Sequence, residues 1–249
     1  MKQYAVVQHT YSEFLGLIEQ HLEKRDIGFN YFRPFVGQDL PGSALQFDGL
    51  FLLAGRNPAL DQATVSWFEH ELNLVSIFRR ADRPVVGFGA GGLIVAAAFG
   101  AELLTEPRHT ASWTTAHITE AGRGDPVAEV LHGRRVLGLF EGHAKLPSDM
   151  EPILLADDGR WLGIRPDTGS YGFLFRPELK PGMIEDMIME ANRDLPDNIG
   201  ELLAEARERW PDMQRLTDDF IVALVKSLNL MTERRKAPVF SLKVCLLYT

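Results

Sequence analysis

A glycine-rich turn between an apolar strand and a helix constrains this chain more than any other feature. Pro84-Val85-Val86 leads into Gly87-Phe88-Gly89-Ala90-Gly91-Gly92, and a run of small and apolar residues follows. A turn of this kind holds either a nucleophile, at the apex of a strand–turn–helix elbow, or a phosphate, at the N-terminus of the helix. A third interpretation is that the glycines only allow the strand and the helix to pack closely.

The phosphate interpretation has a specific form, the dinucleotide-binding pattern G-x-G-x-x-G. Gly87, Gly89 and Gly92 satisfy that pattern. The pattern normally lies on the first strand of its unit, however, and an acidic residue follows it by about 20 positions. Position 112 is Ser112, and the nearest candidate carboxylate is Glu120. The local sequence therefore fits a nucleotide loop better than the wider context does.

The composition excludes several classes of protein. The 249 residues are 45% hydrophobic and 24% charged, with a net charge of −8, so a general nucleic-acid binder is not expected. Cys245 is the one cysteine, which excludes an intrachain disulfide, and no cysteine–histidine cluster has zinc spacing. The sequence has no signal-peptide pattern and no apolar stretch of bilayer-spanning length. We expect a cytoplasmic protein without a metal or cofactor.

The order of the predicted elements indicates an α/β fold. Strands alternate with helices in the first part of the chain, which predicts a mostly parallel sheet covered on both faces. Shorter strands separated by turns follow, and they predict antiparallel additions to the sheet. From Pro181 onwards the chain is mostly helical. The predicted strands are Tyr4–Val7, Phe29–Phe35, Phe47–Ala54, Pro84–Phe88, Ala111–Thr119, Arg135–Glu141, Pro152–Ala156, Trp161–Arg165 and Tyr171–Phe175; the predicted helices are Glu13–Lys24, Leu60–Arg80, Leu93–Leu104, Met183–Asn192, Ile199–Arg209 and Met213–Leu230.

A second segment helps to choose between the interpretations of the turn. Gly172-Phe173-Leu174-Phe175-Arg176-Pro177-Glu178-Leu179 resembles the W-G-x-Q-F-H-P-E-x motif of class I glutamine amidotransferases, in which His and Glu complete a Cys-His-Glu triad. The stretch Arg83 to Gly92 resembles the nucleophile elbow of that family, and Phe47 to Gly55 resembles the strand before its G-G-P oxyanion loop. The resemblance covers roughly residues 1–190 and is closest to the GMP-synthase-like branch.

The resemblance implies a flavodoxin-like three-layer sandwich. Its central sheet should be mostly parallel, with a small antiparallel extension and C-terminal helices. We expect a class I glutamine amidotransferase-like domain over residues 1–193. A helical appendage with a terminal strand, Val239 to Leu247, is expected over residues 194–249.

The resemblance also implies that the catalytic triad is degenerate. Gly89 occupies the nucleophile position and Arg176 the histidine position, and only the carboxylate, Glu178, is retained. Glutamine hydrolysis in this family requires a thiolate to attack the amide and an imidazole to transfer its proton. Glycine supplies no nucleophile, and arginine stays protonated at physiological pH. The family's catalytic residues are therefore absent from these positions.

Several residues are candidates for binding a ligand at the former site. Arg176 could pair with Glu178, because residues two apart on a strand share a face, or it could bind an anionic ligand. Arg56 could assist from the loop Ala54-Gly55-Arg56, which replaces Gly-Gly-Pro. A relocated nucleophile is not expected at Cys245. The candidate ligand-binding residues are Gly55, Arg56, Gly89, Ala90, Arg176, His9 and His143.

The sequence thus favours a catalytically inactive amidotransferase-like protein that is a binding, structural or regulatory subunit of a partner enzyme. A protein partner or a homo-oligomer is expected, through the C-terminal helices and the terminal strand. Two alternatives stay open. One is an enzyme that reuses the pocket for a small anionic substrate, and the other is a nucleotide- or dinucleotide-binding protein that uses the turn from Gly87 to Gly92.

Overall fold

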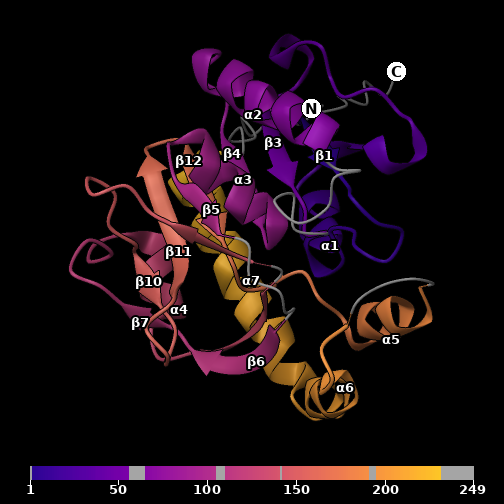
Figure 1. Cartoon of the computed structure of the whole chain (residues 1–249), viewed down its shortest axis with the longest axis vertical. Helices are drawn as coiled ribbons and strands as arrows, with labels where there is room; N and C mark the ends of the chain where they lie inside the picture. Colours follow the sequence, from indigo (N-terminus) through magenta and orange to yellow (C-terminus); the bar gives the residue numbers. More distant parts are fainter. Residues whose placement is uncertain (1, 56–64, 105–109, 141, 191–194, 231–249) are drawn as a thin grey trace, which may run out of the picture.

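An eight-stranded mixed sheet forms the centre of the molecule (Figure 1). The structure is a computed structural model that describes residues 2–55, 65–104, 110–140, 142–190 and 195–230. The strand order is β2-β1-β3-β4-β12-β11-β10-β7. The first five strands of that order are parallel, and β11, β10 and β7 join by antiparallel pairing. The predicted α/β fold, with its mostly parallel sheet and antiparallel extension, is confirmed.

The strands of the sheet are short. They are β1 (Lys2–Val7), β2 (Ile27–Phe32), β3 (Gly49–Leu52), β4 (Val85–Phe88), β7 (His117–Ile118), β10 (Leu154–Leu155), β11 (Trp161–Asp167) and β12 (Ser170–Phe173). Two further pairs lie outside this sheet: β5 (Glu102–Leu104) with β9 (His143–Lys145), and β6 (Thr110–Thr115) with β8 (Arg135–Phe140). Sequence reasoning merged β6 and β7 into one strand and did not predict β5 or β9.

Helices cover both faces of the sheet, because successive side chains of the central parallel strands are mostly apolar and point to opposite sides. On β1, Tyr4 and Val6 pack with α1, α4 and α7, whereas Ala5 and Val7 pack with α2. Helix α3 follows β4 and contributes to both clusters. The helices are α1 (Leu17–Glu23), α2 (Val65–Arg80), α3 (Ala90–Ala98), α4 (Pro126–Leu131), α5 (Pro181–Met189), α6 (Ile199–Glu208) and α7 (Trp210–Ser227).

Helix α7 is part of the main core. Phe220 is fully buried, and its ring centroid lies 5.2 Å from that of Phe173 and 6.0 Å from that of Phe88. The hydroxyl of Tyr4 in β1 donates a hydrogen bond of 2.7 Å to the carbonyl of Leu230. The described helices after residue 194 therefore pack into the core, and the division of the chain at residue 193 stays a prediction. The terminal strand Val239 to Leu247, with Cys245, lies outside the described residues.

One predicted helix ends early. The apolar run after the glycine turn predicted a helix to Leu104, but α3 stops at Ala98. Gly100 adopts a left-handed φ of 92°, which glycine tolerates and which ends the helical path, so that β5 begins at Glu102. Over the described part of the chain, none of the helices combines the length and apolar character needed to cross a bilayer.

Candidate functional site

The glycine turn has the geometry of an elbow. Gly89 lies between the end of β4 and the first residue of α3, with φ 54° and ψ −120°. A side chain at this position would be strained, because L-residues rarely adopt that region. The other glycines serve packing: a Cβ on Gly87 would lie 2.1 Å from the carbonyl oxygen of Gly91, and one on Gly91 would lie 2.1 Å from that of Leu52. Both the elbow and the close-packing interpretations are therefore correct for different glycines.

Two backbone amides of the turn are engaged within the protein. The Gly89 N–H donates to the carbonyl of Phe173 at 2.8 Å, and the Gly91 N–H donates to the carbonyl of Leu53 at 3.1 Å. These two groups point to neighbouring strands and not to a ligand. These two amides are therefore not free to bind a ligand. A phosphate held by this turn would lack donors that a dinucleotide-binding loop supplies.

The apex of the elbow is closed by two neighbouring side chains. A Cβ built on Gly89 would lie 2.7 Å from the Cβ of Ala54 and 3.4 Å from the Cδ of Arg176. Ala54 is fully buried at the end of β3. Its methyl group thus takes the space into which a side chain at the nucleophile position would project. The two substitutions, glycine at position 89 and alanine at position 54, are sterically complementary.

Arg176 lies in a buried cluster with two carboxylates. Its Nε donates to Oε1 of Glu178 at 2.5 Å, and its Nη1 donates to Oε1 of Glu13 at 2.9 Å. The side chains of Arg176 and Glu13 are completely buried, and that of Glu178 is 1% exposed. Thr10 donates its hydroxyl to the other oxygen of Glu13 at 2.9 Å. The predicted ion pair between Arg176 and Glu178 is confirmed, and Glu13 is a second partner.

Both carboxylates of this cluster, Glu13 and Glu178, are held away from water. Burial raises the pKa of Glu178, although the Arg176 guanidinium opposes this shift by its charge and its hydrogen bond. The Glu13 carboxylate also raises the pKa of Glu178, because like charges disfavour each other. The guanidinium is the group that allows both carboxylates to stay buried at this place.

Little space lies beside Arg176. The cavity that it lines, together with residues of β8 and α7, has a volume of about 20 Å³. A cavity of this size holds about one water molecule. The N–H of Arg176 donates to the carbonyl of Leu137 in β8 at 2.9 Å, which fixes the backbone at this corner. On this side the guanidinium is a structural group within the core, without room for a substrate.

His9 lies at the end of β1 and contacts the loop that follows β3. A Cβ on Gly55 would lie 2.4 Å from the Cβ of His9, so these two candidate residues are direct neighbours. Nδ1 of His9 lies 2.9 Å from the carbonyl of Leu53, and Nε2 lies 3.0 Å from the carboxylate of Glu71. Both nitrogens face acceptors, so both carry protons. Burial disfavours the imidazolium, but Glu71, by charge and hydrogen bond, raises the pKa of His9 to about 9.

His9 is therefore a buried cation that ties β1 to α2, and its two N–H groups are engaged. Its ring stacks on Trp67 of α2, with centroids 6.2 Å apart. A histidine in this state cannot accept a proton from a nucleophile near pH 7. His9 is therefore not available as a general base at this site.

The other candidate ligand-binding residues lie at different places in the fold. Ala90 is buried as the first residue of α3, directly after Gly89. His143 lies in β9, opposite Leu104 of β5, with its ring 6.2 Å from that of Trp161. Neither of these contacts involves Gly89, Ala54 or Arg176. Arg56 lies outside the described residues. Within the described ranges, no cluster of three or more His, Cys, Asp or Glu side chains could hold a metal ion.

Sequence reasoning missed two carboxylates, Glu13 and Glu71. Glu13 was placed at the start of a helix, where an exposed acidic residue is usual, so nothing in the sequence marked it as buried. Glu71 did leave a signal. It lies three residues after Phe68 and four before Val75, which places it on the apolar face of α2. A carboxylate on that face requires a buried partner, and His9 provides it.

Comparison with known proteins agrees with the fold. The chain is 25% identical over 202 residues to the glutamine amidotransferase-like protein YfeJ of Salmonella typhimurium, covering 78% of this chain and 83% of YfeJ. Its fold matches that of a glutamine amidotransferase from Thermotoga maritima, with a TM-score of 0.73 at 15% identity, over 91% of this chain and 98% of that one.

A glutamine amido transferase from Methylobacillus flagellatus matches with a TM-score of 0.74 at 19% identity, over 92% of this chain and 96% of the other. No protein-family model matches the chain. The resemblance to glutamine amidotransferase-like proteins and the fold it implies are confirmed. The finer placement near the GMP-synthase-like branch stays a prediction.

Proposed function

We propose that this chain is a glutamine amidotransferase-like protein without glutaminase activity, which acts as a binding or regulatory subunit of a partner enzyme. One observation carries the proposal. Gly89 is the apex of the elbow, and the residue at the histidine position, Arg176, is buried between Glu178 and Glu13. The site therefore lacks a nucleophile and a base at the positions where the fold would use them.

The chemistry of the cluster supports this proposal. A guanidinium does not release its proton at physiological pH, so Arg176 cannot activate a thiol or a water. Glu178, the retained triad residue, holds Arg176 by an ion pair of 2.5 Å. Because the Glu178 carboxylate is paired with Arg176, it does not orient a catalytic imidazole. Each group that once served catalysis would now stabilise the fold.

The same contacts weigh against the two alternatives. An anionic substrate at Arg176 would have to displace Glu178 or Glu13 from a fully buried guanidinium. A nucleotide at the glycine turn would find the amides of Gly89 and Gly91 already bonded to carbonyls. We therefore rank both below the inactive protein. The partner surface is proposed to include the exposed faces of the C-terminal helices.

Ammonia release from glutamine tests the proposal directly. The native chain should release no more ammonia than its Glu178→Ala variant, measured with both proteins at equal concentration. A rate that is proportional to native protein and lost in that variant would overturn the proposal.

Reconstruction provides the positive control. The combined changes Gly89→Cys, Ala54→Gly and Arg176→His restore a thiol, the space for its side chain and an imidazole beside Glu178. Glu13→Gln should accompany them, since an imidazole between two carboxylates would stay protonated and could not act as a base. The quadruple variant should form a covalent adduct with an electrophilic glutamine analogue, detected by mass spectrometry. Absence of that adduct in the folded quadruple variant would contradict the placement of the elbow.

A further inference from the structure

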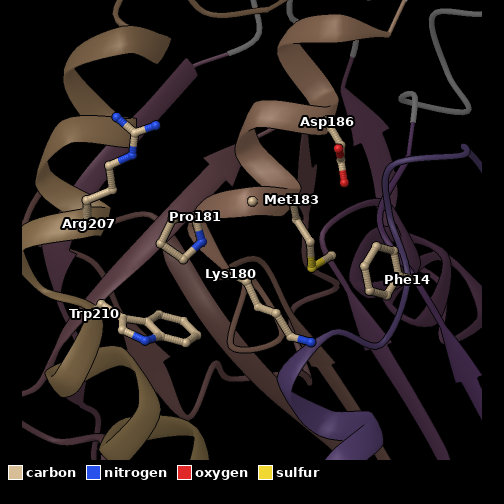
Figure 2. Close-up of a pocket in the computed structure, with 8 residues that line it drawn as sticks. Phe14, Lys180, Pro181, Met183, Asp186, Arg207 and Trp210 are labelled. Carbon is tan, nitrogen blue, oxygen red and sulfur yellow. The ribbon is translucent and has the colours of Figure 1, made fainter.

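A second pocket lies away from the elbow, between α5, the junction of α6 and α7, and the segment before α1 (Figure 2). Its volume is about 450 Å³, which is within the range of small-molecule sites. Nothing in the proposed function uses it. The residues that line it are Phe14, Lys180, Pro181, Gly182, Met183, Asp186, Arg207 and Trp210.

The walls of this pocket are mostly apolar and partly aromatic. Phe14 and Met183 form one side, and Trp210 and Pro181 lie across from them in Figure 2. Met183 is buried and anchors this wall in the core formed by α5 and α6. An apolar ligand group in this pocket would lose water against these side chains, and aromatic side chains favour an aromatic group there.

Two opposite charges stand at the ends of the Phe14–Met183 wall. Figure 2 shows the Asp186 carboxylate on one side of Met183 and the Lys180 ammonium on the other. Neither side chain forms an ion pair with another described residue, and the Lys180 nitrogen lies 5.9 Å from the ring centroid of Phe14. Arg207, in contrast, is paired with Glu185 at 2.7 Å. Lys180 and Asp186 are thus the charged lining residues that have no ion-pair partner among the described residues.

We propose that this pocket binds an α-amino acid with an apolar, preferably aromatic, side chain. The Lys180 ammonium would hold the carboxylate, and the Asp186 carboxylate would hold the amino group, each by a charge-assisted hydrogen bond. The side chain would lie between Phe14 and Trp210. A zwitterion pairs with both Lys180 and Asp186. A simple acid or a simple amine would leave one of these two side chains without an oppositely charged group on the ligand.

The pocket is distinct from the elbow but connected to it through two short segments. Phe14 follows Glu13 in the chain, and Lys180 lies two residues after Glu178. The carbonyl of Glu178 accepts a hydrogen bond of 3.0 Å from the N–H of Leu17, which fixes both segments together. The proposal does not depend on the absence of glutaminase activity, because its test measures binding alone.

Titration calorimetry with L-phenylalanine and L-tryptophan tests the proposal on the full chain. Both should bind, and 3-phenylpropionate and phenethylamine, which each lack one charge, should bind at least tenfold more weakly. L-Phenylalanine should also change the tryptophan fluorescence of the native chain but not that of a Trp210→Phe variant. Absence of binding at millimolar amino acid, or equal binding of either singly charged compound, would overturn the proposal.

Matched substitutions locate the site. Lys180→Gln and Asp186→Asn should each weaken L-phenylalanine binding by about tenfold. Glu208→Gln and Lys226→Gln remove exposed charges outside the pocket and should change the affinity less than twofold. Thermal unfolding without ligand checks that all four variants are folded. Unchanged affinity in both pocket variants would show that amino acids bind elsewhere, and the assignment would then be wrong.

Discussion

The contact between Ala54 and the apex of the elbow predicts a strong energetic coupling between positions 54 and 89. In Gly89→Ala, the new Cβ would lie 2.7 Å from the Cβ of Ala54, well inside van der Waals contact. Overpacking of this kind costs about 1–3 kcal/mol. The backbone at φ 54° and ψ −120° adds about 1–3 kcal/mol for a residue with a side chain. We expect Gly89→Ala to lower the free energy of unfolding by about 2–6 kcal/mol.

Ala54→Gly removes the methyl group that causes the clash. Alone it should cost about 1–2 kcal/mol, from the lost burial of one methyl group and the greater backbone entropy of glycine. In the Gly89→Ala background the same change should recover the overpacking energy of about 1–3 kcal/mol. The double variant should therefore be more stable than the sum of the single effects predicts, by about that amount.

Urea unfolding of the four proteins, followed by circular dichroism, measures this cycle. The slope with denaturant should stay constant, so that the midpoints report stability. Gly87→Ala provides a control. Its Cβ would meet the Gly91 carbonyl at 2.1 Å, and Ala54→Gly should not relieve that clash. If the effects at positions 54 and 89 add to within about 0.5 kcal/mol, then the alanine methyl does not occupy the space of the missing side chain.

Three further predictions concern charge and packing. Arg176→Met leaves two buried carboxylates facing each other, which raises their pKa values. The variant should therefore lose about 3–5 kcal/mol at pH 8 and clearly less at pH 5, measured by urea unfolding. The folded pKa of His9, about 9, exceeds its ordinary value of 6.5, so the stability that His9 contributes is full below pH 6.5 and lost as the pH rises through 9. The stability difference between the native chain and His9→Asn should accordingly fall by about 3 kcal/mol over that range, and a difference independent of pH would contradict the pairing with Glu71. Phe220→Ala should cost about 3–5 kcal/mol in thermal or urea unfolding, whereas an appendage would unfold without affecting the sheet.

The central sheet was predictable because its strands are continuous apolar runs separated by helices of clear periodicity. The positions of β1, β3 and β4 along the chain followed from this pattern, as did the glycine turn after β4. Elements that depend on distant partners were not predictable. β5 and β9 are three residues each and exist through pairing with each other across 38 intervening residues, from Leu104 to His143. The place of α7 in the core likewise depends on Phe88 and Phe173, which no local pattern connects to Phe220.

The sequence indicated the candidate site residues that align with a motif, but not the residue whose role depends on burial. Gly89, Arg176 and Glu178 were found because each replaces or retains a residue of a known motif. Glu13 was not, since a carboxylate at the start of a predicted helix has the same appearance whether it faces solvent or a buried guanidinium. Its role depends on the distance of 2.9 Å to Arg176, a residue far along the chain.

The residues at the proposed former catalytic site depend on one another. Glycine at position 89 leaves space that the Ala54 methyl fills, so a thiol cannot return there without a clash. Arg176 forms ion pairs with both Glu13 and Glu178, so an imidazole that replaced it would be held between two carboxylates and stay protonated. Reversal of one position alone would therefore destabilise the fold without restoring a nucleophile or a base. Because packing and charge at this place are satisfied by the altered residues together, the cluster is better understood as a completed structural core than as an active site that lacks parts.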